Sequence, residues 1–282
     1  MKEEKITANI IKRLWRRSNV LQREEAMAEP CLLNRLELGI AAHFFEDWQE
    51  TLIWSALQGV MGAVFVEDKK APCTAMIIIA DFVFLAGKPD EDFIRQRPEG
   101  FEAQFAILVP KDFSWQQMIE QTLPGRVKKV TRYAIRKNTE FDIKKLQEIV
   151  DSLEDVYQLK MIDMAAYEEI SRTRWACDLC SQFETYEKYR ELGIGTVIYK
   201  GRELVAGASS YTIYEGGIEI EIDTKESYQR RGLALVCGAK LILACLEKGW
   251  YPSWDAQNIG SVRLAEKLGY QFAEEYTAYE CF

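Results

Sequence analysis

The stretch GIEIEIDTKESYQRRGLALVCGAKLILACLEKG, residues 217–249, decides the fold of the C-terminal half of this chain. Its first eight residues alternate between isoleucine and polar or acidic side chains, which is the two-residue period of a β-strand. A charged loop follows, and from Leu233 to Leu246 apolar residues recur at three- and four-residue spacing. The sequence therefore predicts a strand that runs through a short loop into a long helix.

The junction between this strand and this helix predicts a binding site for a diphosphate. The first turn of a helix presents unpaired backbone N–H groups, and the helix dipole favours negative charge at that end. Gly232 lets a ligand approach the backbone closely, while Arg230 and Arg231 add positive charge. The loop matches neither the Walker pattern GxxxxGK[ST] nor the dinucleotide-binding pattern GxGxxG.

The segments on either side of this unit predict an α+β fold with a mixed sheet. Residues 193–200 and 203–214 form an antiparallel meander with 217–224, because glycine-containing turns separate three apolar or alternating runs. Helices are expected on the N-terminal side. On the C-terminal side we expect a short strand, a helix ending at Gly269 and one or two final strands. The predicted helices are 141–170, 175–191, 231–248 and 258–268, and the remaining strands lie at 250–255 and 270–282.

We place a domain boundary near Asn138, which divides the chain into residues 1–138 and 139–282. The first part predicts an α/β domain of unknown role. Its residues 64–87 follow the same order of strand, charged turn, small residues and long strand as residues 197–220. Two interpretations remain open: a degenerate copy of the C-terminal fold that has lost its cofactor loop, and a chance likeness between two β-meanders.

Composition and charge exclude several classes of protein. The chain has 282 residues, a net charge of −8 and a pI near 5.1, so we expect no general nucleic-acid binding. A basic run at residues 12–17 is expected to be the solvated face of an N-terminal helix. Neither a signal peptide nor a span long enough to cross a membrane is recognisable, so we expect a cytoplasmic protein that does not bind membranes.

Cysteine and histidine usage limits the chemistry further. Seven widely spread cysteines are expected to be reduced, and the pair Cys177 and Cys180 has no second CxxC to complete a zinc site. We therefore expect no metal. The single histidine, His43, lies in a helical amphipathic run, which argues against Ser-His-Asp or Cys-His catalysis. Any chemistry must use carboxylates, tyrosines, backbone dipoles or a bound co-substrate.

Two motifs occur in order within residues 192–279. A loop of the pattern [QR]xxGx[GA] follows the strand at 217–224, with Gln229, Gly232 and Ala234 at the defined positions. The second motif is a strand followed by a helix that Asn opens and Lys-x-Gly-aromatic closes. It comprises residues 254–257 and Asn258, Ser261, Leu264, Lys267, Gly269 and Tyr270. With these motifs the segment resembles the GNAT superfamily of acyl-CoA N-acyltransferases, in which the strand before the loop is the fourth, and more narrowly a bacterial subfamily of about this length with a further N-terminal domain.

The resemblance implies an acetyl-CoA-dependent transfer of an acetyl group to a primary amine, without a metal. It implies that the pyrophosphate lies on the loop amides and that the pantetheine pairs like an extra strand with Ile222 and Thr224, where a backbone N–H donates to the acyl carbonyl. Asn258 and Ser261 would contact the pantetheine or the facing loop, and Lys267 the adenosine phosphate. The implied binding residues are Ile222, Thr224, Gln229, Arg230, Arg231, Gly232, Leu233, Ala234, Asn258, Ser261 and Lys267.

Transfer to an amine requires a base, because an alkylamine is protonated near pH 7. Glu219 and Glu221 share one face of the fourth strand and are the candidate catalytic residues. Adjacent carboxylates raise each other's pKa, which would suit this task. We take Glu221 as the first choice because it lies nearer the expected thioester, while a merely solvent-exposed face is the alternative.

One position departs from the family pattern. Many relatives carry a tyrosine that protonates the leaving thiolate, and this chain has Ala265 there. Tyr270, Tyr276 and Tyr279 are the candidate substitutes. The alternative function is an acyl-CoA-binding or interaction module without turnover. The expected partner is a small-molecule or peptide amine, and a homodimer is one assembly that remains open.

Overall fold

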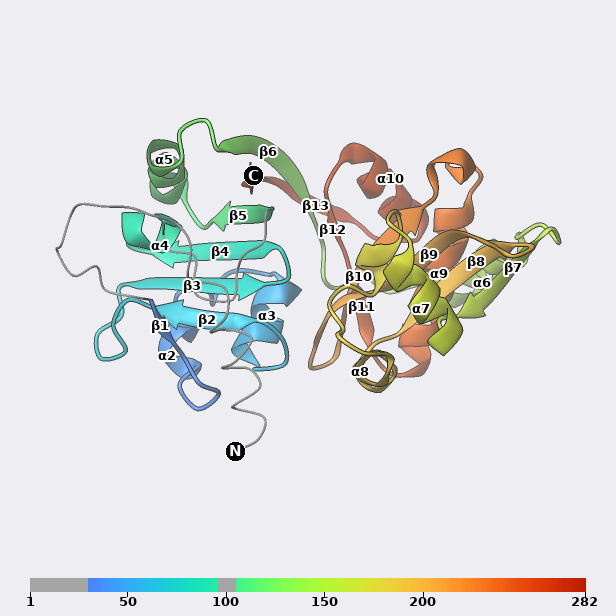
Figure 1. Ribbon diagram of the computed structural model, residues 1–282, viewed down its shortest axis with the longest axis horizontal. Coiled ribbons are helices and arrows are strands. Elements are labelled where there is room, and N and C mark those ends of the chain that lie inside the picture. Colours follow the sequence, from blue (N-terminus) through green and yellow to red (C-terminus); the bar gives the residue numbers. More distant parts are fainter. Residues whose placement is uncertain (1–29, 96–104) are drawn as a thin grey trace. The chain divides into compact units, whose positions relative to one another are not determined.

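The computed structural model describes residues 30–95 and 105–282, which form two compact units (Figure 1). Unit 1 contains residues 30–48, 56–95, 105–130 and 277–282 of the described chain, and unit 2 contains residues 49–55 and 131–276. Relative to the predicted boundary near Asn138, residues 49–55 and 131–138 belong to unit 2 and residues 277–282 belong to unit 1. The expected N-terminal basic helix lies outside the described residues.

The central sheet of unit 2 has five strands in the order β11-β10-β9-β8-β7. The predicted meander is present, and each of its strands pairs antiparallel with the next. A fourth strand, β7, extends it by pairing with β8. β11 pairs parallel with β10, because helix α9 carries the chain back across the sheet between them. The strands are β7 (Tyr157–Met161), β8 (Gly195–Lys200), β9 (Glu203–Tyr214), β10 (Gly217–Thr224) and β11 (Tyr251–Ser253).

Helices cover both faces of this sheet. On one face α9 (Leu233–Glu247) packs against β8, β9 and β10, and α6 (Ile143–Asp151) packs on α9. A Cβ added at Gly238 of α9 would lie 3.2 Å from the Ile222 side chain, so the isoleucines of β10 point toward α9. The other face is covered by the 3-10 turn η1 (Cys177–Leu179), by α7 (Met164–Arg172) and by α8 (Tyr186–Leu192).

Two helix predictions in this region are wrong. The expected helices over residues 141–170 are interrupted by β7, in which Tyr157, Leu159 and Met161 alternate with polar residues at the two-residue period of a strand. The expected helix over 175–191 is divided into η1 and α8, because Thr185 caps a new helix by accepting a hydrogen bond from the Lys188 N–H at 3.2 Å.

The C-terminal elements follow the predicted order. Strand β11 is followed by β12 (Asp255–Ala256), α10 (Ile259–Lys267) and one long final strand, β13 (Phe272–Cys281). Gly269 follows α10 with a φ of +106°, the left-handed conformation expected after a helix end. In unit 2, β12 pairs antiparallel with the end of β6 (Val127–Ile135).

Unit 1 repeats the strand plan of unit 2. Its strands β1 to β4 pair antiparallel, β5 pairs parallel with β4 after a short helix, and the end of β13 pairs antiparallel with β5. Strands β3 and β4 are buried almost throughout, and Trp115 of α5 fills the core beside them. The elements are β1 (Cys31–Leu32), α2 (Gly39–Ala42), β2 (Ala63–Val66), β3 (Thr74–Ile79), β4 (Phe82–Gly87), α4 (Glu91–Arg95), β5 (Ala106–Pro110) and α5 (Phe113–Thr122), with α3 (Thr51–Leu57) crossing the limit between the units.

The loop between β4 and α4 differs from its counterpart in unit 2. The described part of helix α4 carries Glu91 and Asp92 in its first turn, after Asp90. Burial and the neighbouring Asp90 and Glu91 raise the pKa of Asp92. Three carboxylates at a helix N-terminus repel a diphosphate, so this loop does not offer the anion site that the sequence predicts in unit 2. Within the described residues, the helices are too short or too polar to cross a membrane.

Candidate active site

Two neighbouring strands of unit 2 separate at the site. β10 and β11 are paired only from Gly217 to Glu219, where Glu219 lies beside Ser253. The chain then leaves β10, and its next residues, Asp255 and Ala256, pair with β6 instead. At the same level, a β-bulge shifts the register between β10 and β9. The outer edge of β10 beyond Glu219 is therefore left without a neighbouring strand in the described structure.

Backbone groups of β10 face this opening in a defined alternation. The Tyr251 N–H donates to the Gly216 carbonyl at 2.8 Å, and the Lys225 N–H donates to the Val205 carbonyl of β9 at 3.0 Å. Because successive residues of a strand point their backbone groups to opposite sides, Ile222 and Thr224 present theirs to the opening. These are the two residues that the sequence predicts to pair with a pantetheine.

The loop after β10 has the conformation of an anion cradle. Arg230 and Gly232 both have positive φ, +63° and +81°. Gly232 is the N-cap of the 15-residue helix α9, and in this described segment no side chain caps the free N–H groups of the first turn. A Cβ built on Gly232 would meet no described atom within 4 Å, so the space above the backbone is open. Alternating positive-φ residues before a helix N-terminus form a concave nest of N–H groups.

The side chains of this loop lie around the cradle. Arg230 and Arg231 are exposed. The Arg231 guanidinium donates to the Ser227 carbonyl at 3.0 Å and lies 4.8 Å from the Tyr228 ring centroid, which orders it at the loop. Gln229 donates from its amide to the Thr224 carbonyl at 3.3 Å and so ties the loop to the end of β10.

The predicted residues of α10 hold their own helix in place. The Asn258 side chain accepts from the Ser261 N–H at 3.0 Å and caps α10, and the Ser261 hydroxyl accepts from the Trp254 indole N–H at 3.0 Å. Lys267 lies in the exposed last turn of α10, where a cation is favoured by the helix dipole. Each of these side chains thus has a structural role that does not depend on a ligand.

A row of buried polar side chains crosses the sheet where the strands separate. Thr212 of β9, Glu219 of β10 and Ser253 of β11 are register neighbours, so their side chains share one face. Glu219 is 3% exposed, and the other two are fully buried. Among the described residues, Thr212 Oγ1, Glu219 Oε1 and Ser253 Oγ are buried without a hydrogen-bond partner. Three such atoms in one row are costly in a folded protein and indicate a functional site.

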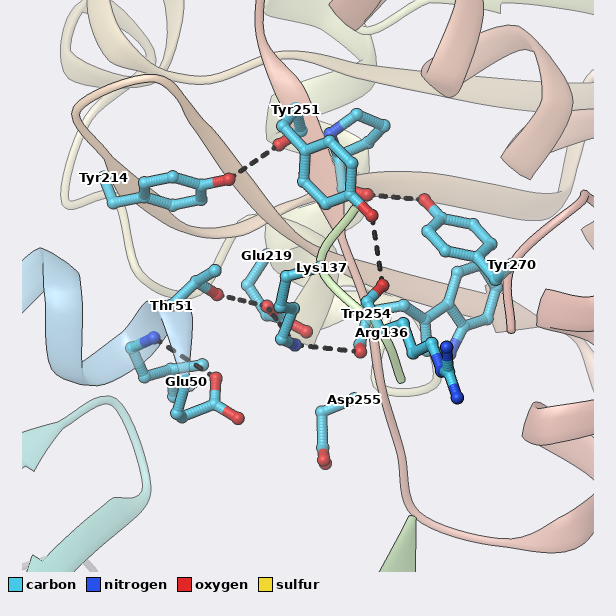
Figure 2. A network of polar contacts seen from close by, with 12 residues as sticks. Glu50, Thr51, Arg136, Lys137, Tyr214, Glu219, Tyr251, Trp254, Asp255 and Tyr270 are labelled. Atoms are coloured by element: carbon cyan, nitrogen blue, oxygen red, sulfur yellow. Dashed lines mark hydrogen bonds and ion pairs between the residues drawn. The ribbon is translucent and has the colours of Figure 1, made fainter. Parts of the chain in front are cut away.

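The second carboxylate oxygen of Glu219 is occupied (Figure 2). The Thr51 hydroxyl donates to Glu219 Oε2, and Lys137 Nζ lies 3.9 Å from the same atom. Lys137 also donates to the Trp254 carbonyl at 3.1 Å, which fixes its ammonium between β10 and β11. Glu219 is therefore held from one side, with Oε1 left to act as an acceptor.

Further buried charges surround this pair. Glu50 and Asp255 face Lys137, and Asp255 is paired with Arg132, whose Nε donates to Asp255 Oδ1 at 2.9 Å. Burial raises the pKa of Glu50 to about 7, although the charge of Lys137 opposes the shift. For Lys137, burial lowers the pKa, but the carboxylates of Glu219, Glu50 and Asp255 outweigh it and the net pKa is raised. The ammonium therefore stays protonated.

The other acidic residues of β10 differ from Glu219. Glu221 is half-buried on the same face of the strand. Asp223, two residues further, lies toward η1, and burial together with the charge of Asp178 raises its pKa to about 6. Of the three carboxylates, Glu219 is the most buried, and both a hydroxyl and an ammonium contact it.

The candidate tyrosines all use their hydroxyls elsewhere. Tyr270 donates to the Pro252 carbonyl at 2.6 Å, and Tyr276 donates to Asp255 at 2.8 Å. Tyr279 belongs to unit 1, where it donates to Glu120 at 2.6 Å. Burial raises the pKa of all three hydroxyls. Ala265, at the position where many relatives have a tyrosine, is fully buried.

Sequence reasoning missed Lys137, Glu50 and Thr51. They lie roughly 80 to 170 positions away from Glu219 along the chain, and a single sequence contains no signal that brings such residues together. Ser253 gave a weak signal, as a polar residue in a short buried strand.

Comparisons with known proteins agree on one family. The model of the GNAT acetyltransferase family matches residues 42–279. A crystal structure of a GCN5-related N-acetyltransferase-like protein from Streptococcus suis is 42% identical, with a TM-score of 0.82 over 88% of this chain and 99% of that one. The uncharacterized N-acetyltransferase YdfB of Bacillus subtilis is 27% identical over 84% of this chain and 92% of its own length.

A tandem GNAT protein from the clavulanic acid biosynthesis pathway covers 90% of this chain and 98% of its own, with 11% identity and a TM-score of 0.53. That likeness concerns the fold, and it agrees with the strand plan that both units share. Since the family match spans most of the chain and includes the open strand edge and the loop, the chain belongs to the GNAT acetyltransferase family.

Proposed function

We propose that this acyltransferase uses acetyl-CoA to acetylate a primary amine by direct attack of the amine on the thioester. The observation that carries the proposal is the open edge of β10, which continues directly into the uncapped N-terminus of α9. A flexible ligand with amide groups can pair with the open edge of β10, and a diphosphate can bind the N–H groups at the start of α9. Coenzyme A is a ligand that combines the two.

The residues present fit coenzyme A. Backbone groups of Ile222 and Thr224 supply a ladder of donors and acceptors for the amides of the pantetheine arm. The buried Thr224 hydroxyl oxygen, without a partner among the described residues, lies at the end of this ladder. The N–H groups around Gly232, with Arg230 and Arg231, would hold the diphosphate. When bound, acetyl-CoA supplies an activated acetyl group on a thiol that leaves readily.

Glu219 is the base in this proposal. Its free Oε1 accepts the proton that the amine must lose, since only the neutral amine has an electron pair for attack. A C–N bond then forms as the C–S bond breaks, the electrons of that bond leave with the sulfur, and the sulfur takes up the proton that the nitrogen loses as the amide forms. The Ile222 N–H, which faces the opening, is the candidate donor to the carbonyl oxygen as negative charge develops on it.

This assignment differs from the expectation that favours Glu221. Glu219 lies at the point where β10 and β11 separate, is almost completely buried, and is held by Thr51 and Lys137. A base needs a fixed position more than exposure, because proton transfer depends on hydrogen-bond distance. Glu221 remains the competing candidate, and the two are distinguished by substitution.

We propose a cationic small-molecule or peptide amine as the acceptor. The whole chain is acidic, with a net charge of −8, and Oε1 of the proposed base has no hydrogen-bond partner among the described residues. A net negative charge attracts positively charged groups. We further propose that the protein acts in the cytoplasm, where its seven free cysteines would stay reduced.

Isotope-labelled acetyl transfer from acetyl-CoA to a panel of polyamines, aminoglycosides and lysine peptides tests the function. The Glu219→Gln variant should lose about 10²- to 10⁴-fold in kcat, the usual contribution of a general base. Glu221→Gln should lose much less. Glu154→Gln, an exposed substitution of the same type, is the control. Equal losses in the two β10 variants would contradict the assignment of the base.

A second candidate function is an acyl-CoA-binding module without turnover. The observation that favours it is Ala265, together with the three tyrosines whose hydroxyls donate to other groups. Tight binding of acetyl-CoA without release of the coenzyme A thiol in the presence of any amine would support this module and exclude the enzyme.

A further inference from the structure

The reaction proposed above places a base beside an unusual group of buried charges, and this inference rests on that proposal. Lys137 Nζ lies 3.9 Å from Glu219 Oε2 and donates to the Trp254 carbonyl at 3.1 Å. Its side chain is only 7% exposed. Burying an ammonium group costs free energy, and a single hydrogen bond to the Trp254 carbonyl does not offset that cost. The contact with Glu219 suggests why it is there.

Glu50 is a buried carboxyl group near Lys137 and Glu219, and its charge acts on Glu219 in the sense opposite to that of Lys137. It is 7% exposed and accepts from the Leu52 N–H at 3.3 Å at the start of α3, next to the Thr51 hydroxyl that binds Glu219. Figure 2 shows Glu50, Thr51, Lys137 and Glu219 gathered in one place. The titratable groups that face Glu50 are Lys137, Glu219, Asp255, Tyr214 and Tyr276, with Arg132 behind Asp255.

We propose that Lys137 and Glu50 are positioning residues that set the pH range of the transfer reaction through their opposite charges on Glu219. Lys137 favours the ionised carboxylate, which is the form that accepts the substrate proton. Glu50, when it is itself ionised, disfavours that form and makes Glu219 a stronger base. Thr51 donates to Oε2 of Glu219, and Oε1 is left without a hydrogen-bond partner among the described residues.

The charges predict different effects for the two residues. Removing the cation favours the protonated form of the base, so the acid limb of kcat/KM should move up. Removing Glu50 should leave this limb in place, because burial raises the pKa of Glu50 to about 7 and the group is neutral at lower pH; it should instead remove the increase in activity that ionised Glu50 produces near neutral pH. Nearby charges change such midpoints by roughly one to three pH units. A residue that only supports the fold would lower kcat without moving the limb.

The experiment is a pH profile of kcat/KM for the acceptor in the full-length protein. We expect Lys137→Gln to shift the acid limb upward by about one unit or more, and Glu50→Gln to leave that limb in place but remove the increase near pH 7. Lys137→Arg should restore most of the wild-type profile. The exposed substitutions Lys144→Gln and Glu154→Gln are the controls, with no change in the profile expected. An acid limb that stays in place in Lys137→Gln, or an increase near pH 7 that persists in Glu50→Gln, would overturn the proposal.

A second readout separates this inference from the proposed function. Carboxyl ¹³C spectra of the ligand-free protein report the titration of individual glutamates whether or not turnover occurs. If Lys137→Gln does not fold, Lys137→Arg provides a variant that keeps the buried positive charge. We expect one glutamate signal, absent in Glu50→Gln, to titrate near neutral pH, and its midpoint to change in Glu219→Gln. If that midpoint is unchanged, the coupling is refuted. Coenzyme A affinity by calorimetry, which tests the proposed function alone, should be the same in these variants.

Discussion

Replacing Gly232 with alanine tests the anion cradle directly. The φ of Gly232 is +81°, and a Cβ there would project into space that no described atom occupies within 4 Å. In the free protein the substitution costs only the strain of a left-handed alanine, about 1–2 kcal/mol. In the complex the same methyl group would lie where the diphosphate approaches the backbone. Losing one hydrogen bond from an N–H to a charged group costs about 1.5–3 kcal/mol.

Gly249 supplies a matched control at the other end of the same helix. It has a φ of +70°, and a Cβ built on it also meets no described atom within 4 Å. Gly249→Ala should therefore lower the free energy of unfolding by the same amount as Gly232→Ala. Only Gly232→Ala should weaken coenzyme A binding, by a factor of about 10 to 150, since each 1.4 kcal/mol is tenfold in affinity.

Isothermal titration with coenzyme A measures the affinity, and urea unfolding measures the stability of both variants. Dephosphorylated fragments separate the parts of the ligand: pantetheine, which lacks the diphosphate, should bind the two variants equally. The reasoning is refuted if Gly232→Ala binds coenzyme A as tightly as Gly249→Ala does, or if pantetheine binding falls as much as coenzyme A binding.

Three further predictions concern the buried polar groups. Tyr270→Phe should lower the unfolding free energy by about 0.5–1.5 kcal/mol, but should lower kcat far less than the hundredfold expected for a lost general acid, because the hydroxyl donates to Pro252. Arg132→Met should destabilise the fold by about 3–5 kcal/mol in chemical unfolding, since Asp255 is left buried and unpaired; adding Asp255→Asn should recover part of the loss. The wild-type free energy of unfolding should fall as pH rises from 4.5 to about 7, because the folded state retains the Glu50 proton that the unfolded chain releases. Glu50→Gln should remove a decrease of roughly 3 kcal/mol across this interval. An unchanged decrease in the variant would contradict the burial argument.

Local pattern was enough to predict the unit that holds the ligand loop. The isoleucine alternation of β10, the helical period of α9 and the glycine at its start are all short-range features, and each is present in the structure. The strand β7 was missed because its alternation is short and follows a strong helical period in α6. Short strands are the elements for which helical and strand periods are hardest to separate.

Local sequence pattern could not predict which charged residues come together at the site. Glu219 was recognised because it lies in the decisive strand, but its partners Lys137 and Thr51 come from distant positions in the sequence. The preference for Glu221 followed from distance along the strand alone. Burial and the separation of β10 from β11, which favour Glu219, appear only when the sheet is assembled.

A crystal structure of the protein with acetyl-CoA would test the central claim most directly. We predict the diphosphate within hydrogen-bond distance of the N–H groups around Gly232, and the pantetheine paired with Ile222 and Thr224 along the open edge of β10. An acetyl-CoA molecule bound elsewhere, or an edge of β10 left unpaired at saturating ligand, would contradict it.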